Sequence, residues 1–102
     1  AAAPIGDSAG RINAKASSIV GPSSQADRSG SLVLGFFGPA RATSITPPAG
    51  MTELEDVAST AGTYKATLEV AAGSASAGPI GPLTASAAGT SASVVQVIVI
   101  RP

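Results

Sequence analysis

The sequence predicts an all-β fold, an antiparallel β-sandwich of about six or seven strands with Greek-key or jelly-roll-like connections. Apolar runs are short, and the strongest is SVVQVIVI at residues 93–100, which is rich in the β-branched residues that suit strands. The 12 Gly and 8 Pro residues punctuate the chain with turn signals. Helical periodicity of useful length is missing, so short strands joined by turns explain the pattern best.

The length of 102 residues indicates one compact domain. We assign residues 11–102 to a single β-sandwich domain. Residues 1–10 contain Pro4, Gly6, Asp7 and Gly10 and are expected to form an N-terminal arm or loop. This arm is either frayed or docked on a neighbouring subunit.

The expected strands are separated by loops that are rich in Gly, Pro and small polar residues. The strands are residues 11–20, 31–37, 51–57, 63–70, 83–87 and 93–100, with a further short strand allowed at 43–46. Residues 21–30 and 71–82 are expected to be loops, and residues 89–92 a turn. Gly35 inside its strand indicates a bulge or a close approach by another backbone.

The strand at residues 63–70 has the cleanest alternation in the chain. Tyr64, Leu68 and Val70 are expected to point inward, and Thr67 and Glu69 outward.

Charge and composition exclude several classes of function. The 6 basic and 6 acidic residues cancel, so neither a nucleic-acid nor a membrane partner is expected. No apolar stretch approaches the length of about 20 residues that a membrane-spanning helix needs. With no His and no Cys, the usual catalytic triads and most zinc sites are excluded. We expect no enzyme activity, no catalytic residues and no cofactor.

The acidic cluster is Glu53, Glu55 and Asp56. Glu53 and Glu55 lie two residues apart and therefore on the same face of a strand, as a carboxylate pair or a hard-cation site would require. A solvated strand face explains the pattern better, so no metal site is assigned.

A carbohydrate site is left open but unsupported. Sugar sites commonly use exposed aromatic platforms, and this chain has no Trp. Tyr64 lies in the inward row of its strand, and Phe36 and Phe37 occupy opposite faces of theirs.

From residue 31 onward the chain resembles a β-sandwich module found in virion proteins of tailed phages and in surface or secreted proteins of actinobacteria. The matching segments are GSLVLGFFG at residues 30–38, TPPAGMTE at residues 46–53, the strand with Tyr64 and Lys65, Leu83-Thr84-Ala85 after a Gly-Pro-rich turn, and the ending VVQVIVIRP.

The resemblance implies a fold and no catalytic residues. Two departures from the family pattern concern its extent and one contact. In the family the segment is commonly the C-terminal half of a longer unit, whereas here it stands nearly alone. An aromatic that often follows TPPAGMTE is replaced by Leu54-Glu55.

Both faces of the strand at residues 93–100 are apolar, which is unusual for a strand with one face in water. A sandwich standing alone would leave one face uncovered. We therefore expect an interface with neighbouring subunits. Its predicted residues are Val33, Phe37, Val95, Val97 and Val99. Coverage of this face by loops or by the N-terminal arm is the alternative.

These observations predict a non-enzymatic structural protein of a virion, either a capsid decoration (cement) protein or a tail or fibre component. It would act as a homo-oligomer, or on a lattice of other virion subunits, through apolar and strand-edge contacts. The alternatives are a secreted carbohydrate-binding or adhesion module and a subunit of an extracellular filament.

Overall fold

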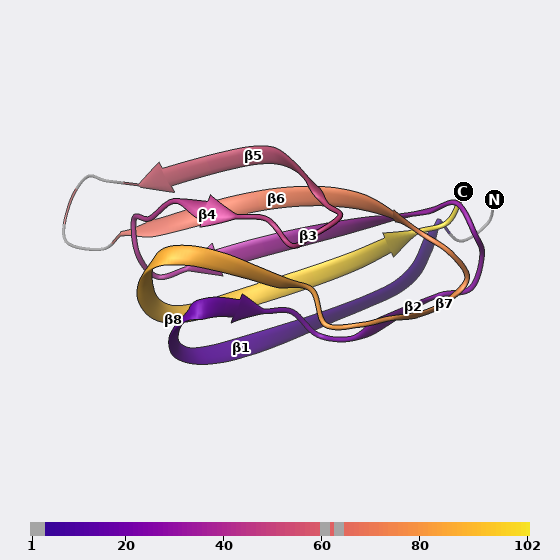
Figure 1. The fold of residues 1–102 in the computed structure, drawn as a ribbon, viewed down its shortest axis with the longest axis horizontal. Helices are drawn as coiled ribbons and strands as arrows, with labels where there is room; N and C mark the ends of the chain where they lie inside the picture. The colour runs from indigo at the N-terminus through magenta and orange to yellow at the C-terminus, as the bar shows by residue number, and fades with distance from the viewer. Residues whose placement is uncertain (1–3, 60–61, 63–64) are drawn as a thin grey trace.

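The computed structural model describes residues 4–59, 62 and 65–102, and it is built of antiparallel strands (Figure 1). Within this part of the chain there is no helix of the length and hydrophobicity needed to cross a membrane. The strands are β1 (Ile5–Val20), β2 (Ser24–Ala26), β3 (Ser31–Pro39), β4 (Ile45–Thr46), β5 (Thr52–Ser59), β6 (Ala66–Ala75), β7 (Gly78–Ile80) and β8 (Thr84–Ile100).

The strands form a six-stranded main sheet and a two-stranded sheet. The main sheet has the order β1-β8-β3-β6-β5, with β4 also paired to β8, and β2 pairs with β7. The first strand thus pairs with the eighth, the second with the seventh and the third with the sixth, which is the nested pairing of a jelly roll. The predicted all-β antiparallel sandwich is confirmed.

The second layer of the sandwich is built largely by the long strands β1 and β8, which bend over the main sheet (Figure 1). Residues 5–13 of β1 pair with residues 93–100 of β8, and residues 16–20 pair with residues 84–91. The register shifts between Asn13 and Ala16, where the paired strands turn the corner. The buried amide of Asn13 donates to Val20 O at 2.9 Å and to Ser93 Oγ at 3.3 Å, which satisfies polar groups at this bend.

The core lies between the main sheet and this second layer. The apolar residues buried there come from β1, β3, β4, β6 and β8, and they are Ile19, Val33, Phe37, Ile45, Ala71, Ala85, Val95 and Val97. Val99 continues the same row of β8 and is also fully buried. We call this side of the main sheet the covered face.

The covered face corrects the predicted interface. Val33, Phe37, Val95, Val97 and Val99 are each at most 4% exposed in the single chain. They are core residues because the bent halves of β1 and β8, with β4, lie over them. The expectation that they face a neighbouring subunit is therefore wrong.

The ring of Phe37 explains why position 35 is a glycine, and neither a bulge nor a neighbouring backbone does. The pairing of β3 with β6 and β8 runs without a register shift. A Cβ at Gly35 would lie 2.7 Å from Cε2 of Phe37, so the buried ring of Phe37 occupies the space beside Gly35.

Several segments expected to be irregular are strands. The predicted arm is part of β1 from Ile5 onward, paired with the end of β8. The predicted loop 71–82 contains the end of β6 and all of β7, and the loop 21–30 contains β2. The predicted turn at 89–92 lies inside β8, where the strand curves from one layer to the other. In each case pairing with a neighbouring strand outweighs local residue preference.

The inward and outward faces of β6 are the reverse of those expected. Thr67 and Glu69 are buried, whereas Leu68 is exposed and Val70 is half-buried. The register pairs Phe37 with Glu69, and directly paired residues share a face, so Glu69 points to the covered face. The expected position of Tyr64 lies outside the described residues.

A matched pair of substitutions in β8 tests this assignment of faces. Val97→Ala should lower the free energy of unfolding by about 2 kcal/mol, because it leaves a cavity in the core. Val94→Ala, on the opposite face of the same strand, should change it by less than about 0.5 kcal/mol. Urea unfolding at low protein concentration measures both values. Equal effects, or a larger effect at Val94, would contradict the assignment.

Candidate functional site

The second face of the main sheet carries apolar side chains that nothing in the described chain covers. We call it the open face. Its large exposed side chains come from all five strands of the main sheet path, and they are Ile5, Ile12, Leu32, Val57, Leu68 and Val94. Half-buried apolar side chains fill the spaces between them, namely Leu34, Phe36, Val70, Ile98 and Ile100.

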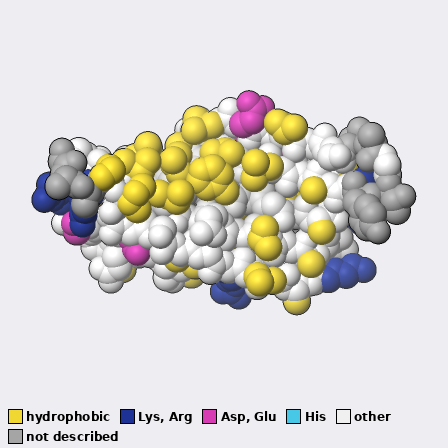
Figure 2. Space-filling model, turned by 180° about the vertical axis from the view of Figure 1, so that it is seen from behind, with side chains coloured by type: hydrophobic (Ala, Val, Ile, Leu, Met, Phe, Trp, Pro, Cys, Tyr) yellow, Lys and Arg dark blue, Asp and Glu magenta, His cyan; other side chains and the backbone are white. Residues whose placement is uncertain are grey.

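The open face is nearly free of charge. Among its paired positions in the described chain, only Glu55, opposite Val70, is ionisable. Figure 2 shows this side of the molecule, with apolar side chains running along the sheet and charged groups at its margins. An extended apolar patch with a polar rim is typical of a protein interaction surface.

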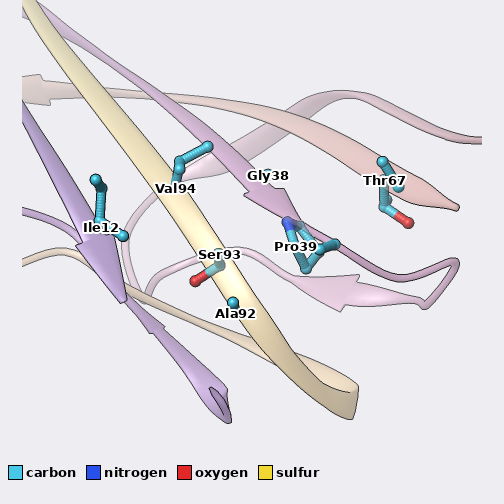
Figure 3. Close-up of a pocket in the computed structure, with 9 residues that line it drawn as sticks. Ile12, Gly38, Pro39, Thr67, Ala92, Ser93 and Val94 are labelled. Carbon is cyan, nitrogen blue, oxygen red and sulfur yellow. The ribbon is translucent and has the colours of Figure 1, made fainter. Parts of the chain in front are cut away.

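One end of the open face is hollowed. The hollow has a volume of about 380 Å³ and is lined by residues of four neighbouring strands (Figure 3), including Ile12, Pro39, Thr67 and Val94. The hydroxyl of Thr67 already donates to Arg41 O at 2.8 Å.

The other hydroxyl of the lining, Ser93 Oγ, accepts a hydrogen bond from the Asn13 amide at 3.3 Å. Because both hydroxyls have partners within the chain, the hollow suits an apolar group better than a polar small molecule.

The main sheet has two edge strands, β5 and β1. β5 is exposed along its whole length and carries Glu53, Glu55 and Asp56, as well as a bulge. Charges and bulges on an edge strand discourage pairing with another chain. β1 forms the opposite edge, beside the exposed Ile5 and Ile12, and it also carries charged residues and register shifts. Charges and bulges therefore do not distinguish the two edges.

A cluster of three carboxylates lies on the covered side of β5 and β6. Each of Glu53, Asp56 and Glu69 places one carboxylate oxygen within 4.8 Å of the other two. Glu53 and Asp56 are exposed, whereas Glu69 is 0% exposed. In the described structure no N–H or hydroxyl donor reaches either carboxylate oxygen of Glu69, and its side-chain contact is with the Glu53 carboxyl.

A β-bulge decides which acidic residues meet. The register shifts between Glu53 and Glu55, so Glu53 pairs with Ala71, Glu55 with Val70 and Asp56 with Glu69. Glu53 and Asp56 consequently share the covered face with Glu69, and Glu55 points to the open face. The expectation that Glu53 and Glu55 share a face is wrong, because the bulge inserts a residue between them.

Burial changes the acidity of the cluster. Removal of Glu69 from water is the largest cause that raises its pKa, from 4.5 to about 8, and a hydrogen bond with the Glu53 side chain and the negative charges of Glu53 and Asp56 raise it further. Burial and the charges of Glu53 and Glu55 also raise the pKa of Asp56, against a backbone hydrogen bond with Ile45 that lowers it. At neutral pH the raised pKa favours the protonated form of the Glu69 carboxyl.

The sequence contained a weak signal for this cluster. Glu69 alternates with Leu68 and Val70, so a reversed choice of inward face would have placed it in the interior. The bulge between Glu53 and Glu55 leaves no comparable signal, because no Gly or Pro marks it. The predicted absence of catalytic residues stays a prediction.

No protein-family model matches the chain, and no curated protein or solved structure matches it either.

The acidity of Glu69 predicts a pH dependence of stability. In the folded state its pKa of about 8 lies above the 4.5 of an ordinary Glu, so the folded state keeps a proton that the unfolded state loses. This stabilisation is fully present below pH 4.5 and is lost as the pH rises toward 8. With chelator present, unfolding free energy should fall by up to about 1.4 kcal/mol per pH unit in this window.

The matched variants for this prediction are Glu69→Gln and Glu55→Gln. Urea unfolding between pH 5 and 8 should give a much flatter profile for Glu69→Gln, while Glu55→Gln should keep the slope of the unmodified chain. A flat profile for the unmodified chain, or an unchanged slope in Glu69→Gln, would contradict the burial of an acidic group at this position.

Proposed function

We propose that the chain is a non-enzymatic structural subunit of a virion, a capsid decoration protein or a tail or fibre component, held by apolar and strand-edge contacts. The observation that carries the proposal is the open face, an apolar surface with Glu55 as its one ionisable paired position in the described chain, on a sheet whose other face is already covered. Such a surface in water favours association with a neighbour.

The dimensions of the molecule support contact with a neighbour over this face. The chain measures 44 × 20 × 20 Å. A face along its length therefore has about the area that each partner contributes to a standard interface, about 800 Å². Burial of each exposed Val, Leu or Ile side chain contributes about 1.5 kcal/mol or more. The interface comprises the open face, in place of the five core residues predicted from the sequence.

The strand edge adds a second type of contact. The β1 edge lies beside the open face, so a neighbour on that face can also accept and donate backbone hydrogen bonds along β1. Repeated use of one face and one edge is how identical subunits build oligomers and lattices. This arrangement supports a cementing role.

The virion assignment rests on the sequence resemblance, from GSLVLGFFG to the VVQVIVIRP ending. Two further features favour a structural role over a catalytic one. The chain has neither His nor Cys, and the two hydroxyl groups that line the hollow already have hydrogen-bond partners within the chain. The extracellular filament and the secreted carbohydrate-binding or adhesion module remain the alternative outcomes of the experiments.

The oligomeric state tests the proposed contact surface. Sedimentation velocity from 1 to about 100 µM should show reversible association of the unmodified chain. Leu32→Asp and Val94→Asp should each weaken association by at least about 100-fold, because a buried unpaired carboxylate is costly. Thr84→Asp, an exposed position in the second layer, should leave it unchanged. A monomer at all concentrations, or equal weakening by Thr84→Asp, would contradict the proposal.

The location of the chain tests the virion assignment separately. Antibodies against the folded chain should label particles purified on density gradients, and mass spectrometry should find the chain there at a fixed ratio to the other subunits. Recovery in cell-surface filaments, or glycan binding that Tyr64→Ala abolishes, would replace the assignment with one of the alternatives.

A further inference from the structure

The carboxylate cluster of Glu53, Asp56 and Glu69 contains a buried acidic group with no N–H, hydroxyl or cationic partner in the described chain. Glu69 is fully buried, and its hydrogen-bonding contact there is with the Glu53 side chain, itself a carboxyl group of the cluster. Buried carboxylates in proteins are normally hydrogen-bonded, ion-paired or bound to a metal. In the described chain no Lys or Arg forms a salt bridge with any of the three, since the ion pair present joins Arg101 to Asp27.

We propose that Glu53, Asp56 and Glu69 bind a divalent cation of the Ca²⁺ class. One oxygen from each carboxylate lies within 4.8 Å of the other two. Ca²⁺ bonds to oxygen at about 2.3–2.6 Å, so oxygens on opposite sides of the ion are separated by roughly 4.6–5.2 Å. The three oxygens therefore fit around a single Ca²⁺ ion.

The chemistry of the ligands selects the type of ion. All three side chains are hard oxygen donors, and the chain has no His or Cys to favour zinc or copper. Mg²⁺ demands near-ideal octahedral geometry at about 2.0–2.1 Å and keeps most of its waters, so it should bind more weakly. The exposed side of Glu53 and Asp56 leaves room for water ligands that complete the larger shell of Ca²⁺.

The site would fix an edge strand to the body of the sandwich. Glu53 and Asp56 belong to β5, which is exposed along its length, and Glu69 belongs to the buried row of β6. Asp56 also has a backbone hydrogen bond with Ile45 of β4. The cation would thus join β5, β6 and β4. This role does not depend on the open face or on assembly.

Calorimetric titration of the chelator-treated chain tests the proposal, at pH 7.5 and at a protein concentration where it is monomeric. CaCl₂ should bind with a stoichiometry of one, and MgCl₂ at least about tenfold more weakly. At ten times the dissociation constant, Ca²⁺ should raise the melting temperature by about 5 °C or more. Glu69→Gln and Asp56→Asn should each weaken Ca²⁺ binding by at least about tenfold.

The control is Glu55→Gln, which removes an acidic group of the same strand on the opposite face and should bind Ca²⁺ like the unmodified chain. Two results would overturn the proposal. One is the absence of binding heat and of any melting shift at about 10 mM CaCl₂. The other is an equal loss of binding in Glu55→Gln, which would indicate only general attraction to an acidic strand.

Discussion

Burial of one valine row of β8 inside the chain's own sandwich is the constraint on which the structure depends. β8 pairs with β1, β3 and β4, and its bent first half supplies part of the layer that covers its second half. Val95, Val97 and Val99 therefore lose contact with water without a second chain. As a result, only one face of the main sheet is covered, because the bent strands that form the second layer lie on that side.

This constraint determines what remains for function. With the covered face closed, the apolar side chains of Leu32, Leu68 and Val94 have no layer of their own. A sheet face of this kind, nearly free of charge and rich in β-branched residues, associates readily with another apolar surface. The acidic, bulged β5 limits pairing at its edge of the sheet, so contact over the open face is favoured over pairing along β5.

The fold class could be predicted because short apolar runs and frequent Gly and Pro indicate strands and turns, whichever way the strands are paired. The face of each strand that points to the interior could not be predicted. In residues 93–100 both rows are apolar, so alternation cannot tell Val94 from Val95, and only the path of β1 and β8 over the sheet decides. The same ambiguity reversed the faces of β6.

The acidic cluster shows a second limit of the sequence. Glu53, Asp56 and Glu69 meet because a bulge in β5 coincides with the register of β6, and pairing between distant segments sets both. The strand from Ile5 to Gly10 illustrates the same point, since its glycines disfavour a strand until β8 is placed beside it.

The absence of Cys allows the most direct test of the central claim, that one face is closed internally and the other is closed by a neighbour. Thiol labelling rates should be measured for Val94→Cys and Val97→Cys across the concentration range of association. The thiol at position 97 should be protected at every concentration, and that at position 94 should react quickly when dilute and be protected on assembly. Rapid labelling of position 94 in the assembled state, or concentration-dependent labelling of position 97, would contradict the account.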